Sequence, residues 1–156
     1  MTTRPFDTLE QYRVEIQFAL QQAARRVDWF DIDLSAAGAA ERASADALKR
    51  MLAGSRLARV RLLLHDDNYF HRHCPRLASL LAVYGHAFEV RLIDDSHKTE
   101  RENWLLADGL LVRRYHADAM RGEATSEGRT IAGCRQRFES MWEIAVPPSE
   151  GRRLFI

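Results

Sequence analysis

Hydrophobic positions change from helical to alternating spacing near residue 26. Residues 8–26 open on Thr8 and Gln11, which have the spacing of a helix capping box, and then repeat apolar side chains every three or four residues. Residues 27–34 instead alternate apolar side chains with aspartates. The pattern predicts a long N-terminal helix over residues 8–26, followed by a strand.

The middle of the chain repeats the order of strand and helix. The near-continuous apolar run over residues 59–65 is typical of a strand that is covered on both faces, and residues 88–93 form a further predicted strand. Helical spacing over residues 44–54 and 75–85 separates these strands, and each helix ends at a glycine. We expect Ser44 to cap the first of these helices. Strand, helix, strand, helix, strand predicts a parallel α/β core.

The last third of the chain predicts a hairpin, a loop and a helix. The hairpin covers residues 104–115 and turns at Asp108-Gly109. Residues 116–129 are polar and lack an apolar period, which predicts a mobile loop. Helical spacing returns over residues 130–145 and stops before Pro147 and Pro148, and the tail over residues 146–156 becomes basic and then apolar.

These elements predict one α/β domain over residues 1–156. Its parts are the N-terminal helix (8–26), a core (27–145) and the tail (146–156). The core is expected to hold a mixed sheet, made of a parallel βαβαβ unit plus the hairpin, with helices on both faces.

Composition narrows the functional classes. A chain of 156 residues, 46% hydrophobic and 29% charged, has the size and usage of one globular domain. Its net charge of +1 provides no general attraction to nucleic acid or anionic membrane, so any such binding must be local. No apolar run approaches the ~20 residues that span a bilayer, and the N-terminus lacks the apolar core of a signal peptide. We therefore expect a cytoplasmic protein without membrane association.

Residues 101–109, Arg-Glu-Asn-Trp-Leu-Leu-Ala-Asp-Gly, carry the most informative motif. An apolar run leads to Asp108, and a glycine follows it. This segment resembles the His-x-Lys-x-x-x-x-Asp strand of the phospholipase D superfamily, with Arg101 in place of the histidine and Asn103 in place of the lysine. The resemblance extends over about residues 27–145 through the order of elements and the final helix.

The resemblance implies a phosphodiesterase fold whose chemistry has been lost. In that superfamily the histidine attacks phosphorus, the lysine binds phosphate oxygens, and two copies of the motif meet at one site. A single copy therefore implies a homodimer. Neither arginine nor asparagine is a competent nucleophile, so no catalytic residue and no cofactor are expected. Asn103 can still donate a hydrogen bond to a phosphate, and Arg101 can pair with it.

Two further arginines follow, where active members usually carry Gly-Ser-x-Asn. Arg113 and Arg114 could grip a phosphate bidentately, and Tyr115 could stack on a base. The alternative is a solvated edge strand whose charges prevent edge pairing. We expect a binding or interaction module for a phosphate-containing ligand, and nucleic acid stays among the candidate ligands. The expected site comprises Arg101, Asn103, Asp108, Arg113 and Arg114.

A rival hypothesis is a metal-dependent hydrolase. The predicted parallel strands end in aspartate and histidine, and ligands in open α/β sheets collect at such ends. Asp31, Asp33, His65 and Asp66 are candidate ligands of a divalent metal that would activate water. The opposing interpretation is that aspartates after strands cap helices and turns. A third hypothesis is a scaffold that binds proteins through the first helix and the Leu154-Phe155-Ile156 tail.

Overall fold

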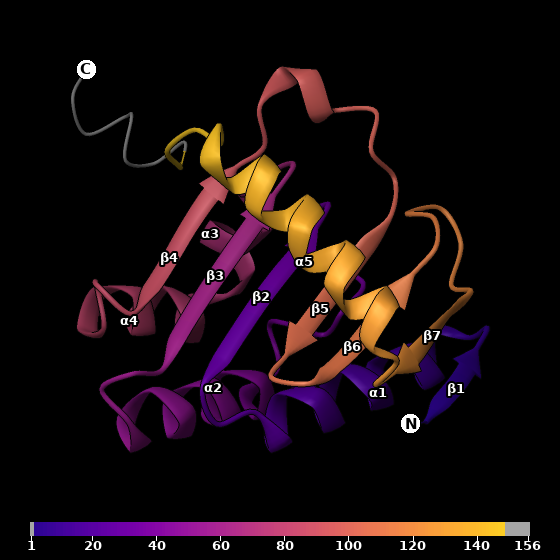
Figure 1. Cartoon of the computed structure of the whole chain (residues 1–156). Coiled ribbons are helices and arrows are strands. Elements are labelled where there is room, and N and C mark those ends of the chain that lie inside the picture. The colour runs from indigo at the N-terminus through magenta and orange to yellow at the C-terminus, as the bar shows by residue number, and fades with distance from the viewer. Residues whose placement is uncertain (1, 149–156) are drawn as a thin grey trace.

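A seven-stranded mixed sheet in the order β1-β7-β6-β5-β2-β3-β4 organises the computed structural model (Figure 1), which describes residues 2–148. The strands are β1 (Thr3–Phe6), β2 (Arg26–Asp31), β3 (Arg59–Leu64), β4 (Phe88–Leu92), β5 (Asn103–Ala107), β6 (Leu110–Arg114) and β7 (Gly122–Thr125). The helices are α1 (Leu9–Gln22), α2 (Arg42–Gly54), α3 (Asn68–His73), α4 (Pro75–Val83), the short 3₁₀ helix η1 (Asp95–His97) and α5 (Gly128–Glu143).

The sheet combines a parallel half with an antiparallel half. β2, β3 and β4 pair in parallel, and α2, α3 and α4 lie in the connections between them. The β5–β6 hairpin pairs antiparallel to the other edge of β2. The predicted βαβαβ core, the hairpin and the mixed sheet are therefore confirmed.

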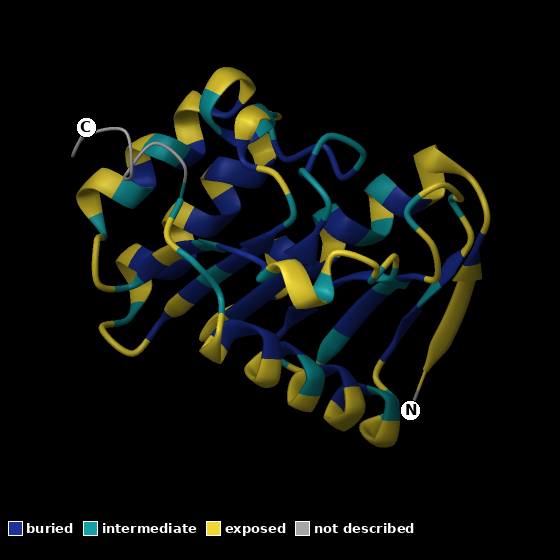
Figure 2. Ribbon diagram, turned by 90° about the horizontal axis from the view of Figure 1, so that it is seen from above, coloured by how far each residue is buried: buried dark blue, intermediate teal, exposed yellow. Residues whose placement is uncertain are grey.

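Helices cover both faces of the sheet, as predicted. α5 lies across one face, and α1, α2 and α4 cover the other (Figure 1). Buried side chains accordingly form two clusters: the larger one includes Ile16, Trp29 and Leu48, and the smaller one under α5 includes Trp104 and Phe138. The strands are buried between these layers, whereas most of β1 is exposed (Figure 2).

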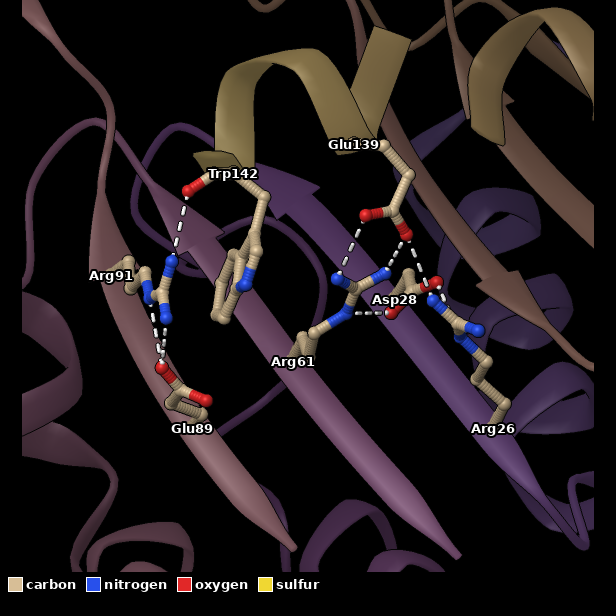
Figure 3. Close-up of polar contacts among 7 residues, drawn as sticks. All are labelled: Arg26, Asp28, Arg61, Glu89, Arg91, Glu139 and Trp142. Carbon is tan, nitrogen blue, oxygen red and sulfur yellow. Dashed lines mark hydrogen bonds and ion pairs between the residues drawn. The ribbon is translucent and has the colours of Figure 1, made fainter. Parts of the chain in front are cut away.

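Charged side chains attach α5 to the sheet (Figure 3). Buried Asp28 accepts hydrogen bonds from Arg26 and Arg61, at 3.0 and 2.8 Å, and both arginines also pair with Glu139 of α5. The guanidinium of Arg61 lies 5.2 Å from the ring centroid of Trp142, so an aromatic side chain shares this layer with the ion pairs. This alternation of charges leaves no charge of the group unpaired.

The prediction of a mobile loop over residues 116–129 is wrong from residue 122 onward. Residues 122–125 form β7, which joins β6 on one side and the unpredicted β1 on the other. α5 already begins at Gly128, because Glu127 accepts hydrogen bonds from the backbone N–H groups of Arg129 and Thr130. Gly-Glu-Ala-Thr carries no apolar alternation, and its strand conformation depends on backbone pairing with residues far away in the sequence.

Several predicted boundaries also shift. α1 ends at Gln22 rather than at residue 26, and β2 ends at Asp31 rather than at residue 34, where Leu34 has a positive φ of 74°. α2 begins at Arg42, so Ser44 is not its cap. The Ser44 hydroxyl instead donates to the carbonyl of Gly38, at 3.0 Å. Thr8 caps α1 as expected, by accepting from the N–H of Gln11. The tail from residue 149 onward lies outside the described residues.

Candidate functional site at the carboxyl edge of the sheet

Three of the predicted ligand residues, Arg101, Asn103 and Arg114, lie at one edge of the sheet, here called the carboxyl edge. It is formed by the last residues of β2, β3, β4 and β6 and the first residues of β5 and β7, because β5 and β7 run antiparallel to their neighbours. Asn103 opens β5 and faces Arg114, its register partner at the end of β6. The topology thus places two predicted ligand residues side by side.

Four polar side chains form a buried cluster under α1 at this edge. Asp31, Asn103, Arg114 and Tyr12 are each no more than 3% exposed. Asn103 Oδ1 and Asp31 Oδ1 both accept from the N–H of Ile32, at 2.9 Å, and Asp31 Oδ2 accepts from Leu34 at 3.1 Å. These bonds hold the backbone that leaves β2, so the oxygens of Asp31 and Asn103 are engaged with the protein itself.

Arg114 is the poorly satisfied member of the cluster. Its Nη2 lies 3.8 Å from Asp31 Oδ1, its Nη1 donates only to Met120 Sδ at 3.9 Å, and its Nε has no partner. Its guanidinium carbon lies 5.2 Å from the ring centroid of Tyr12. Within residues 2–148, no hydrogen bond therefore joins this buried cation to an oxygen atom. Burial of a charged group with so few hydrogen bonds is costly.

Burial also changes the acidity of the neighbouring groups. It raises the pKa of Asp31 to about 6, although Arg114 and the amide hydrogen bonds act in the opposite direction. The pKa of Tyr12 is likewise raised, first by burial and then by the charge of Asp31. Tyr12 therefore stays a neutral phenol, and Asp31 changes charge near neutral pH.

Arg101 and His65 occupy the edge nearer α5. Arg101 is exposed, and no described carboxylate pairs with it. Its backbone carbonyl accepts from Asn103 Nδ2 at 3.4 Å, so it flanks the buried cluster. His65 stacks on Phe30 and has a buried Nε2 without a partner. Burial, followed by the charge of Arg101, lowers the pKa of His65 to about 4, so its ring is neutral at pH 7.

Two predicted ligand residues lie elsewhere. Asp108 follows the opposite end of β5, where it accepts from the N–H groups of Ala24, Arg25 and Arg26 at 2.8, 3.2 and 2.9 Å. Arg113 points to the α5 side and pairs with Glu102 at 3.2 Å and Glu123 at 2.7 Å. Asp108 thus joins α1 to β2, and the two terminal nitrogens of Arg113 are engaged with acidic side chains, whereas its buried Nε has no partner.

The four residues of the metal hypothesis do not converge. Asp33 forms a turn with Ser35, and Asp66 accepts from the N–H of Asn68 at 2.7 Å. His65 and Asp66 do line a cavity of about 270 Å³, but neither Asp31 nor Asp33 borders it. Across residues 2–148, no group of three or more His, Cys, Asp or Glu residues is arranged to hold a metal ion. The turn and cap interpretation therefore describes Asp33 and Asp66.

Sequence reasoning missed Tyr12 and Met120 as members of the site. Tyr12 comes from α1, and its helical spacing with Ile16 marks it only as a buried position. Met120 reaches Arg114 from the polar connection between β6 and β7. Neither residue carries a local signal for this role, because their contacts with Arg114 depend on how separate elements pack together.

Solved structures define the class of fold. TrmBL2, an archaeal chromatin protein whose structure is described as showing a novel mode of DNA binding, superposes with a TM-score of 0.70 at 15% identity over 94% of this chain. The match covers 54% of the TrmBL2 chain, so the present chain spans about half of its length. NucT from Helicobacter pylori superposes with a TM-score of 0.65 at 12% identity, and the match covers 94% of this chain and 98% of the NucT chain. These likenesses show that the chain shares its fold with both proteins.

The chain belongs to the family described as domain of unknown function DUF7931, whose profile matches residues 8–154. Its sequence has no significant match among curated proteins. No helix within residues 2–148 has both the length and the apolar character to cross a membrane.

Proposed function

We propose that this chain is a non-hydrolytic phospholipase D-like module that binds a phosphate-containing ligand at the carboxyl edge, through Arg101, Asn103 and Arg114. The observation that carries the proposal is the buried guanidinium of Arg114, which donates no hydrogen bond to an oxygen atom within residues 2–148. A phosphate offers several oxygens to the fork of donors of an arginine, and such charge-assisted bonds are among the strongest in proteins.

A ligand would reach Arg114 by displacing the segment that covers it. Met120 contacts Arg114 from the connection between β6 and β7, and the residues of this connection are mostly exposed. Arg101 stands at the same edge with a side chain that no described carboxylate neutralises. One phosphate group would thus meet a buried cation and an exposed cation.

The side chains at the motif positions support binding without hydrolysis. Arg101 and Asn103 stand where the superfamily has its nucleophile and its phosphate-binding lysine, and neither attacks phosphorus. His65 is neutral, but its Nε2 is buried and its ring packs against Phe30. No metal-binding group within residues 2–148 offers another route to activated water.

Nucleic acid is the ligand class that we favour. TrmBL2, a chromatin protein whose structure is described as showing a mode of DNA binding, shares this fold with the chain. The net charge of +1 provides no broad attraction, so we expect binding that depends on a few local contacts and weakens with salt.

The test is a binding titration with and without the Arg114 charge. Phosphate should raise the melting temperature of the wild-type protein. A fluorescently labelled single strand of about 12 nucleotides should also bind it, with an affinity, measured by fluorescence anisotropy, that falls as the salt concentration rises. Arg114→Met should weaken oligonucleotide binding by about 10-fold or more, because it removes charge-assisted hydrogen bonds. Arg135→Met removes the same charge from an exposed position on α5 and is the matched control.

Equal binding by the Arg114→Met and Arg135→Met variants would refute the proposed site. Hydrolysis is measured in parallel with bis(p-nitrophenyl) phosphate, with and without EDTA. We expect no turnover in either condition. Turnover that EDTA abolishes would instead support the metal-dependent hydrolase.

A further inference from the structure

A second hollow lies at the carboxyl edge, next to the connection that covers Arg114. It has a volume of about 460 Å³ and lies among β1, β6 and β7. Its lining residues are Pro5, Phe6, Asp7, Gln11, Tyr115, Arg121 and Gly122. None of these residues belongs to the predicted phosphate site.

Tyr115 lines this hollow, and its aromatic ring is oriented by a contact with Arg113. The guanidinium of Arg113 lies over its ring, 5.1 Å from the centroid, and Glu102 and Glu123 hold that guanidinium from the other side. Tyr115 is nevertheless 43% exposed. Because Arg113 covers one face of the ring, the exposed area comes from the other face and the edges. An exposed aromatic ring that is already oriented is a stacking platform for a planar group.

The polar groups in the hollow suit a base better than a free phosphate. The carboxylate of Asp7 accepts hydrogen bonds, as an exocyclic amino group of cytosine or adenine requires, and it repels an isolated anion. Gln11 accepts from the N–H of Asp7 through Oε1, at 3.0 Å, which leaves its amide donors for other partners. Arg121 lines the same hollow as an exposed cation that no described carboxylate pairs with.

The backbone beside the hollow is closely packed. Gly122 lies so close to β6 that an added Cβ would be 2.0 Å from the carbonyl oxygen of Arg113 and 2.7 Å from the ring of Phe6. Tyr115 donates its N–H to the carbonyl of Arg121 at 3.0 Å, which closes the connection between β6 and β7. Tyr115 and Arg121 therefore lie at the two ends of one short segment. Met120 in that segment covers Arg114.

We infer that this hollow is a nucleobase subsite, in which an unpaired base stacks on Tyr115, presents an amino group to Asp7 and has its phosphate near Arg121. The inference rests on the proposed function, since a neighbouring phosphate of the same strand would lie at Arg114. Stacking on Tyr115 requires a base that is free of its partner strand. Single-stranded nucleic acid is therefore the substrate class that fits, and duplex is excluded from this subsite.

The experiment uses fluorescein-labelled oligo(dC) of 12 nucleotides, its duplex with oligo(dG), and inorganic phosphate as a separate probe. Tyr115→Ala should weaken binding of the single strand by about 5- to 100-fold, because it removes one base stack. Tyr115→Phe keeps the ring and should bind within about twofold of the wild type. Inorganic phosphate should raise the melting temperature of the wild type, Tyr115→Ala and Tyr115→Phe by the same amount.

The outcomes separate the two proposals. If Tyr115→Ala binds oligo(dC) as tightly as Tyr115→Phe, or if the duplex binds as well as the single strand, the nucleobase subsite is refuted. If phosphate protects the wild type and oligo(dC) does not bind, the subsite is refuted while the phosphate site stands. If neither probe binds, both proposals are refuted.

Discussion

At the scale of residues, the buried Asp31 and the half-buried His65 at the carboxyl edge respond to pH in opposite directions. The pKa of Asp31 is raised to about 6, mainly by burial, so the folded protein binds more protons than the unfolded chain between about pH 4 and 6. The pKa of His65 is lowered to about 4, again mainly by burial, so the folded protein binds fewer protons between about pH 4 and 6.5. Rising pH therefore lowers the free energy of unfolding through Asp31 and raises it through His65.

Single substitutions should separate these effects. Relative to the wild type, His65→Gln should make the free energy of unfolding rise less between pH 4.5 and 6.5, and Asp31→Asn should make it rise more. Each difference should be about 1–3 kcal/mol, since one pKa unit corresponds to about 1.4 kcal/mol. Urea titrations at the two pH values measure it. Parallel pH profiles for both variants and the wild type would contradict the two pKa shifts.

At the scale of elements, the edge strand β7 depends on close backbone approach more than on side chains. Gly122 pairs with Arg114 of β6 and with Phe6 of β1, so it lies between two strands. The carbonyl oxygen of Arg113 and the ring of Phe6 occupy the space that a Cβ would need. This close packing explains why a strand forms at a segment whose sequence has no strand pattern.

Gly122→Ala should therefore lower the free energy of unfolding by about 2–4 kcal/mol, because the methyl group forces β6 and β1 apart. Gly133 lies in α5, where an added Cβ meets nothing within 4 Å. Gly133→Ala is the matched control and should raise stability by about 0.5–1 kcal/mol. Chemical denaturation measures both variants. Equal effects would show that β7 tolerates a side chain at residue 122.

At the scale of the whole molecule, the sequence has one segment, residues 101–109, that resembles the phospholipase D motif. The resemblance to the phospholipase D superfamily implies that two copies meet, so the homodimer stays a prediction. Sedimentation velocity should give a particle of twice the 18.0 kDa chain mass at micromolar concentration. A single 18.0 kDa species at every concentration would contradict it, and the proposed binding site would then act within one chain.

Much of the architecture follows from local sequence patterns. Helical spacing in α1, the apolar run of β3, the strand pattern of β4 and the Asp108-Gly109 turn were sufficient to predict the parallel core, the hairpin and helices on both faces. Each of these signals lies within a few neighbouring residues. Apolar periodicity predicts such elements because burial acts on each face of a helix or strand separately.

The site was predicted only in part, and the tertiary structure decided the rest. The motif located Arg101 and Asn103, but sequence spacing did not indicate that Asp108 binds the start of β2 or that Arg113 turns to Glu102 and Glu123. The strand formed by residues 122–125, the burial of Arg114 and its contacts with Tyr12 and Met120 depend on elements far apart in the chain. The charge of a side chain is a property of the sequence. Its burial and its partners exist only once the register of the sheet and the packing of the helices bring distant segments together.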